Sequence, residues 1–340
     1  MINLYSDTQT RPTDAMRAAM AAAEVGDEQR REDPTVIALE ERVATLLGQE
    51  AAVFLPSGTM CNAIGVRLHI RPGGDEYFLG EMAHPLRFEA GGPAAISGAV
   101  LTVVPGEGGI FGAQALRDAL GAHSPGDRYA PRPRLVSVEQ PVNVGGGRIW
   151  PAGQILEVLD VAAEHGLRSH LDGARLMNAV VASGISASDY AGDFDTAWID
   201  FTKGLGAPVG ACLAGSSELI SEAWRYKQMW GGAMRQAGVI AAAGLYALEH
   251  HVDRLADDHA NARRLAEGLA EIDGITIDPA TVETNIVAFG VADAPAFCAA
   301  LEADGVRMGP LGPDRVRAVT HLDVDADGIE RAIAAAARAA

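Results

Sequence analysis

Cysteine is scarce in this 340-residue chain, and its three cysteines lie far apart at Cys61, Cys212 and Cys298. Their number is odd, and none belongs to a CxxC motif or to a Cys/His spacing typical of metal sites. We therefore expect three reduced thiols in the protein core and no metal site.

Long apolar runs are absent too. Although 48% of the residues are hydrophobic, no uninterrupted apolar stretch reaches the roughly 18 residues that suggest a membrane-spanning helix. The N-terminal sequence MINLYSDTQTRP lacks both the basic and the apolar region of a secretory signal. The sequence therefore predicts a soluble, cytoplasmic protein.

Basic clusters are also missing. The chain has 27 Lys and Arg against 45 Asp and Glu, for a formal net charge of −18 at pH 7. Nucleic acids and anionic membrane surfaces are bound by clustered basic side chains, so we expect neither as a partner. The expected partners are small molecules and further copies of the chain.

Apolar, β-rich runs alternate with segments of helical period along most of the chain, which is typical of an α/β protein with a mostly parallel sheet. The predicted strands are Ala52–Leu55, Glu76–Leu79, Val100–Val104, Leu135–Val138, Leu167–Leu171, Thr196–Phe201 and Gly210–Ala214. The predicted helices are Thr35–Leu47, Thr59–Leu68, Ala113–Leu120, Gly153–His165, Ser217–Met229 and a long one from about Gln236 to His250.

A chain of this length exceeds the roughly 250 to 300 residues that one core usually serves. We therefore predict a large α/β domain at residues 1–245 and a smaller α+β domain at residues 246–340. After Val252 the smaller domain is expected to contain a long helix, strands near Ile275–Ile277 and Asn285–Phe289, another helix, a strand at Val316–Thr320 and a terminal helix at Glu330–Ala340.

A lysine stands where an apolar strand runs into a glycine-rich turn. Thr202 and Lys203 follow the strand, and the turn extends to Gly210. Burying an ammonium group is costly, which favours the free amine that forms imines. The alternative is that Lys203 is only a solvated residue at the end of a strand.

An aspartate ends another predicted strand, about thirty residues before the lysine. A pyridinium ring needs a carboxylate beside its nitrogen, and Asp172 is placed to supply it. His170 alternates with Asp172 on the same face of the strand. It either bonds the carboxylate of Asp172 or packs in the core.

A phosphate-binding turn is indicated at Ser57, Gly58 and Thr59, which follow a strand and begin a helix. Backbone N–H groups at the start of a helix bind phosphate, and Ser or Thr caps such a start. Turns of this kind are common, but a phosphate turn, an aspartate and a lysine in this order are together much more specific. They predict a pyridoxal phosphate enzyme in which Lys203 holds the cofactor as a Schiff base.

The chain resembles the threonine aldolase family of the fold-type-I pyridoxal phosphate enzymes nearly from end to end. The resemblance implies an aspartate aminotransferase-like large domain with a mostly parallel sheet. The matching strings are LYSDTQTRPT, VGDE followed by EDPTV, FLPSGTMCN, HPLRFEAGGPAAISG, HLDGARLMNAV, FTKGLGAPVGACLAG, GGAMRQAG and RAVTHLDV.

The resemblance also implies roles for individual residues. His84 stacks on the cofactor ring, and Arg175 and Arg317 hold the substrate carboxylate with help from Ser6. The alternative for each arginine is an ion pair with a neighbouring acid. The implied cofactor-binding residues are Ser57, Gly58, Thr59, His84, Asp172, Arg175, Thr202 and Lys203.

The implied reaction is the cleavage of L-threonine, L-allo-threonine or a related L-β-hydroxy-α-amino acid to glycine and an aldehyde. A base must remove the β-hydroxyl proton, and His84 and Glu89 are the candidates, either directly or through a water. Alternatively, Glu89 only orients His84 or caps a helix. The alternatives with the same cofactor are β-elimination, racemisation or the retro-aldol cleavage of another substrate. The alternatives without catalysis are a carrier of pyridoxal phosphate or a scaffold protein.

Three departures from the family pattern concern the substrate and the oligomer. Val142 replaces a histidine of the relatives' E-N-T-H-N string, a tyrosine is absent from Glu28–Asp33, and near GGAMRQAG Lys227 is shifted and Trp230 is added. A larger apolar surface near the site favours bulkier β-substituents, aromatic ones among them. Family sites use residues of a second subunit, so we expect at least a homodimer, with a tetramer the commoner arrangement among relatives.

Overall fold

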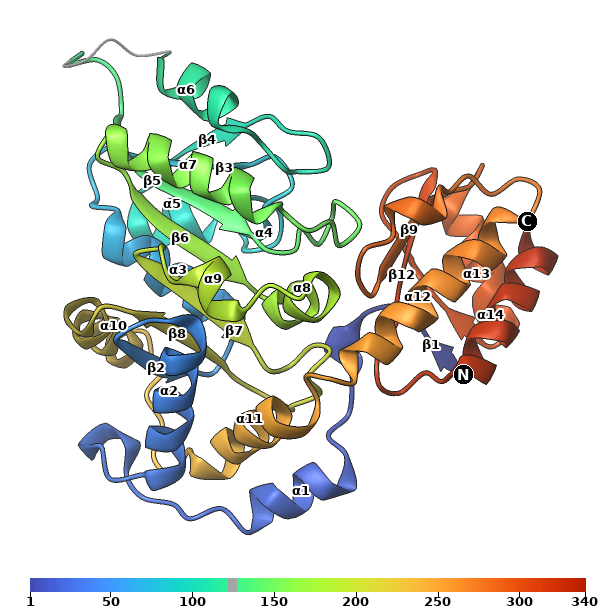
Figure 1. Ribbon diagram of the computed structural model, residues 1–340, viewed down its shortest axis with the longest axis horizontal. Helices are drawn as coiled ribbons and strands as arrows, with labels where there is room; N and C mark the ends of the chain where they lie inside the picture. The colour runs from blue at the N-terminus through green and yellow to red at the C-terminus, as the bar shows by residue number, and fades with distance from the viewer. Residues whose placement is uncertain (122–126) are drawn as a thin grey trace.

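A seven-stranded sheet forms the centre of the larger lobe in the computed structural model, which describes residues 1–121 and 127–340 (Figure 1). The strand order is β2-β8-β7-β6-β5-β3-β4, and all neighbours are parallel except that β8 runs antiparallel to β2 and β7. The strands are β2 (Ala51–Leu55), β3 (Asp75–Gly80), β4 (Val100–Val104), β5 (Arg132–Glu139), β6 (Arg168–Gly173), β7 (Thr196–Asp200) and β8 (Ala211–Gly215). All seven predicted strands and the mostly parallel sheet are confirmed.

Helices cover both faces of this sheet, because successive strand residues point to opposite faces and both sets are apolar. Phe54 and Ile199 pack on one face, whereas Val53 and Trp198 pack on the other. The first face is covered by α1 (Asp14–Ala21), α2 (Pro34–Leu47), α6 (Ala113–Gly121), α7 (Ala152–Glu164), α8 (Leu176–Ser183), α9 (Ala187–Ala191) and α11 (Gly238–His250). The second is covered by α3 (Gly58–His69), α5 (Gly92–Ser97) and α10 (Ser217–Met229).

The smaller lobe is an α+β unit built mainly from the C-terminal part of the chain, drawn in orange and red in Figure 1. Its antiparallel sheet has the order β11-β12-β9. The elements are α12 (Leu255–Ala270), β9 (Ile286–Gly290), α13 (Ala294–Ala303), β10 (Val306–Arg307), β11 (Gly309–Pro310), β12 (Arg315–Val319) and α14 (Ala326–Ala339). The N-terminal strand β1 (Ile2–Asn3) joins this lobe by pairing with β10.

The two hydrophobic cores divide the chain differently from the predicted ranges. Ala247 and Leu255 belong to the core of the larger lobe, whereas Leu4 belongs to the core of the smaller one. The boundary expected after residue 245 therefore falls inside α11. Helical period alone does not tell which core a helix faces, and the pairing of β1 with β10 joins residues too far apart in the sequence to be foreseen.

The predicted strand at Ile275–Ile277 is wrong, because only Thr276 forms an isolated bridge, to Gly290. The three cysteines are free and buried, as expected. Among the described residues, no helix is long and apolar enough to cross a membrane.

Candidate active site

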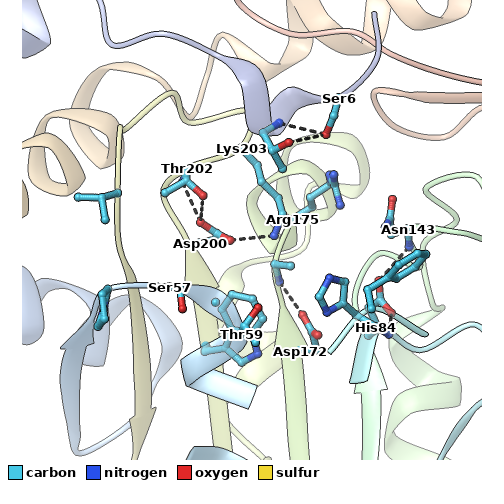
Figure 2. A pocket seen from close by; sticks show the side chains of 18 of the residues that line it. Ser6, Ser57, Thr59, His84, Asn143, Asp172, Arg175, Asp200, Thr202 and Lys203 are labelled. Carbon is cyan, nitrogen blue, oxygen red and sulfur yellow. Dashed lines mark hydrogen bonds and ion pairs between the residues drawn. The ribbon is translucent and has the colours of Figure 1, made fainter. Parts of the chain in front are cut away.

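The carboxyl ends of β5, β6 and β7 and the start of α3 open into a cavity of about 510 Å³ (Figure 2). Ligands of open α/β sheets commonly bind at this edge, because the loops and helix N-termini there project beyond the strands. Of the predicted site residues, only Glu89 is not in the lining. The predicted residues that line the cavity are Ser6, Ser57, Gly58, Thr59, His84, Asp172, Arg175, Thr202, Lys203 and Arg317.

Lys203 is largely buried, and its amine is held by a carboxylate that was not predicted as a site residue. Its Nζ lies 2.8 Å from Oδ2 of Asp200, and the other oxygen of Asp200 accepts hydrogen bonds from the backbone N–H and the hydroxyl of Thr202. The chain contains only two lysines. The other, Lys227, is fully buried against Glu28. Lys203 is therefore the one lysine that lines this cavity.

Asp172, at the end of β6, is held with its carboxylate at the cavity wall. Its Oδ1 accepts a hydrogen bond from the backbone of Ala174, and its Oδ2 accepts one from Nδ2 of Asn62 at 2.8 Å. His170 does not bond Asp172 but contacts Thr196 and Asn62. The structure therefore favours the second of the two alternatives for His170, that it packs in the core. Burial lowers the pKa of His170 to about 3.

The start of α3 presents unpaired backbone donors to the cavity. Ser57 caps the helix by accepting a hydrogen bond from the N–H of Met60, while the N–H groups of Gly58 and Thr59 have no partner among the described residues. A Cβ at Gly58 would lie 2.4 Å from the ring of Trp198, so only glycine fits this close approach. The helix start can therefore bind an anionic group.

His84 is paired with Glu89, which lies behind it. Its Nδ1 is 2.8 Å from Oε1 of Glu89. Burial lowers the pKa of His84, but the hydrogen bond with Glu89 and the charge of Asp172 outweigh this effect and raise the pKa above its ordinary 6.5. Nδ1 is thereby committed to Glu89, which leaves Nε2 as the ring nitrogen that can take up a proton.

Glu139, at the end of β5, lines the cavity and was not predicted as a site residue. It accepts hydrogen bonds from the backbone N–H groups of His84 and Asn143, at 2.9 and 3.1 Å. Burial and the charge of Asp172 raise the pKa of Glu139 to about 7. Its carboxyl group thereby ties the backbone at His84 and at Asn143 to the end of β5.

The two arginines of the site are held differently. Arg175 forms a buried fork on Asp7, with Nε–Oδ2 and Nη2–Oδ1 distances of 2.8 and 2.6 Å, so the alternative reading of an ion pair with a neighbouring acid is realised. Burial raises the pKa of Asp7, but the charge of Arg175 outweighs it and lowers the pKa to about 2. Arg317 donates from Nη1 to Oδ1 of Asn143 at 2.9 Å, and its buried Nε has no partner among the described residues. Both arginines still line the cavity.

A family model for β-eliminating lyases matches residues 3–292 of the chain. This chain belongs to the β-eliminating lyase family. A probable low-specificity L-threonine aldolase of Arabidopsis thaliana is 40% identical over 336 residues, covering 97% of this chain and 94% of the relative. The low specificity L-threonine aldolase of Escherichia coli K12 is 41% identical over 328 residues, covering 95% of each chain.

Solved structures agree on the fold. A threonine aldolase from Leishmania major superposes with a TM-score of 0.85 at 19% identity, covering 99% of each chain. A putative L-allo-threonine aldolase from Listeria monocytogenes gives 0.81 at 19% identity, covering 100% of this chain and 96% of that chain. The fold-type-I architecture predicted from the sequence is confirmed.

Val142 and Trp230, which depart from the family pattern, lie outside the cavity of the single chain. Val142 is buried and faces Gly109 and Gly145, although its neighbour Asn143 lines the cavity. Trp230 packs on Tyr226 with ring centroids 5.3 Å apart and is not in the lining. The expected apolar enlargement of the site by Trp230 is therefore not found within one subunit.

The remaining departures are in contact with each other. Lys227 forms a fully buried ion pair with Glu28 at 2.9 Å and lies over the ring of Trp224. The shifted lysine and the segment that lacks the family tyrosine thus form one packed unit. Removing either charge alone would leave its partner buried and unpaired, which is costly.

Proposed function

We propose that this protein cleaves L-threonine, L-allo-threonine and related L-β-hydroxy-α-amino acids to glycine and an aldehyde, with pyridoxal phosphate as its cofactor. The observation that carries the proposal is that one cavity gathers a lysine amine, a carboxylate, a helix start and two arginines. When bound, pyridoxal phosphate supplies an electron sink for the negative charge that develops on the α-carbon.

The residues present fit this cofactor by their chemistry. Lys203 supplies the amine that holds the cofactor aldehyde, and Asp172 supplies the carboxylate for the ring nitrogen. Gly58 and Thr59 offer free N–H groups to the phosphate, next to the hydroxyls of Ser57 and Thr202. His84 stands on the cavity wall where an imidazole can stack on the ring (Figure 2).

Arg317 is proposed as the main ligand of the substrate carboxylate, because Arg175 already shares its charge with Asp7. Replacing Arg317 with alanine is expected to raise KM by about 10- to 100-fold, the cost of a charged hydrogen bond, with a smaller change in kcat. Arg317→Lys keeps the positive charge but not the planar fork of donors. Its KM should therefore lie between that of the unchanged protein and that of Arg317→Ala. An unchanged KM in Arg317→Ala would show that the carboxylate binds elsewhere. Ser6 is expected to assist, since its hydroxyl lines the same cavity.

His84 is proposed as the base that removes the β-hydroxyl proton, with Glu89 orienting it. A base must be neutral, so kcat/KM should rise as the pH passes upward through the raised pKa of His84. In Glu89→Gln the main contact that raises this pKa is lost. The acidic limb of the profile should then move to lower pH, and the plateau should fall because the base is weaker. If the acidic limb of the kcat/KM profile did not move in Glu89→Gln, Glu89 would not be the residue that orients His84.

Product analysis tests the reaction itself. Purified protein loaded with pyridoxal phosphate is mixed with L-threonine, L-allo-threonine and L-threo-phenylserine, and the products are quantified. We expect glycine and the matching aldehyde in equal amounts. A keto acid with ammonia would indicate β-elimination, and the D-amino acid would indicate racemisation. The apolar Val142, buried beside the cavity, is the feature that motivates these rival reactions.

We also propose that the chain works in the cytoplasm as a homo-oligomer, a dimer at least. Apolar side chains near residues 231–238 support an interface there, because Met229 is 63% exposed and Val239 is 43% exposed. Sedimentation analysis should give a mass of at least twice 35.4 kDa. A monomer would contradict this proposal.

A further inference from the structure

A buried amide lies between two carboxylates of the site. Asn62, on α3, is 1% exposed. Its Nδ2 donates one hydrogen bond to Oδ2 of Asp172 at 2.8 Å and another to Oε1 of Glu89 at 2.7 Å. Its Oδ1 accepts from Nε1 of Trp198 at 2.8 Å and from Nε2 of His170 at 3.1 Å. Both hydrogens and both lone pairs of the amide are therefore used.

The orientation of this amide is fixed by its neighbours. An indole N–H can only donate, so the oxygen of Asn62 must face Trp198 and the nitrogen must face the carboxylates. His170 agrees with this assignment. Its Nε2 carries the proton for Asn62, and its Nδ1 accepts from the hydroxyl of Thr196, as a neutral imidazole does. If the amide were flipped, its oxygen would face the carboxylates of Asp172 and Glu89, and its NH₂ group would face the N–H groups of Trp198 and His170.

The position of Asn62 on α3 joins three parts of the site. Asn62 follows Gly58 by four residues, so both lie on the same face of the helix. The start of this helix offers N–H groups to the cavity, and one turn later the amide holds Asp172 and Glu89. The negative charges of these two carboxylates repel each other. The amide group of Asn62 offsets this repulsion, because its Nδ2 donates one N–H to each carboxylate.

We propose that Asn62 is a positioning residue that aligns Asp172 with the cofactor ring nitrogen and Glu89 with His84 at the same time. The proposal rests on the proposed cofactor site. The charged groups that face His84 are Glu89, Asp172 and Glu139. Asn62 contacts the first two, so one substitution should disturb both cofactor binding and the state of His84.

Asn62→Ala and Asn62→Ser test this with two measurements that need no turnover. Binding of pyridoxal phosphate to the cofactor-free protein should weaken by about tenfold, the scale of a lost hydrogen bond to a charged group. The pKa of His84, followed by NMR in the cofactor-free protein, should fall by at least about half a unit, because Glu89 is no longer held against Nδ1.

Two further variants separate the effects. Glu89→Gln should lower the pKa of His84 but change the affinity for pyridoxal phosphate far less than Asn62→Ala does. Asn178→Ala removes another buried amide, which bonds His259 and neither carboxylate, and should change neither measurement. It serves as the control for the loss of a buried amide as such.

A folded Asn62 variant that moves only one measurement, or neither, overturns the proposal. If both Asn62 variants fail to fold, the amide supports the fold rather than the site, and the proposal also fails. A wild-type protein that does not bind pyridoxal phosphate would instead overturn the proposed function.

Discussion

Replacing Lys203 with alanine is expected to abolish turnover and the visible absorbance of the bound cofactor. The residue is one of only two lysines in the chain, and the other is buried in an ion pair on a different part of the larger lobe. No other lysine amine lines the cavity to take its place. Turnover should fall by roughly 10⁴-fold or more, the scale seen when a covalent catalytic group is removed.

The matched control is Lys227→Arg, which keeps a positive charge next to Glu28 and leaves Lys203 in place. This variant should retain the cofactor absorbance, whatever it does to the melting temperature. If Lys203→Ala kept either its absorbance or its turnover, the assignment of the cofactor-binding lysine would be wrong.

Replacing Asp172 with asparagine is expected to have the second-largest effect. The charge next to the cofactor ring nitrogen is lost, so the ring is no longer held protonated and stabilises negative charge poorly. The new amide also sets a donor against Nδ2 of Asn62 or against the N–H of Ala174, both of which now donate to Asp172. We expect turnover to fall by about 100- to 1,000-fold, corresponding to roughly 3 to 4 kcal/mol of transition-state stabilisation.

Spectroscopic titration with pyridoxal phosphate and steady-state kinetics measure the two consequences of Asp172→Asn. Asp195→Asn provides the control. Asp195 pairs with Arg168 at the opposite end of the parallel strands, and it does not line the cavity. Turnover in Asp172→Asn close to that of this control would mean that the ring nitrogen has another partner.

The sequence predicted those parts of the site whose chemistry is local. Lys203 and Asp172 stand at strand ends in unusual apolar surroundings, and Ser57-Gly58-Thr59 combines a turn with a helix cap. Because the carboxyl ends of parallel strands meet at one edge, segments far apart in the sequence converge there. The strands themselves were predictable since both faces of the sheet are covered and each strand is a nearly continuous apolar run.

The parts that were missed depend on partners distant in the sequence. The fork between Asp7 and Arg175 joins residues 168 positions apart, and the bond between Asn62 and Asp172 spans 110 positions. Nothing local distinguishes Asn143 from other loop asparagines. Two signals were nevertheless available: the scarcity of lysine narrows the imine-forming residue to two positions, and Asp200 precedes Lys203 by three residues at the end of the same strand.

Reduction with borohydride shows which lysine holds the cofactor, because it converts the imine to a stable amine. The protein is loaded with pyridoxal phosphate, reduced, digested and mapped by mass spectrometry. We expect one added pyridoxyl phosphate group on the peptide that contains Lys203 and none on the peptide that contains Lys227. Label confined to Lys227 or to the N-terminal amine, with Lys203 unmodified, would contradict it.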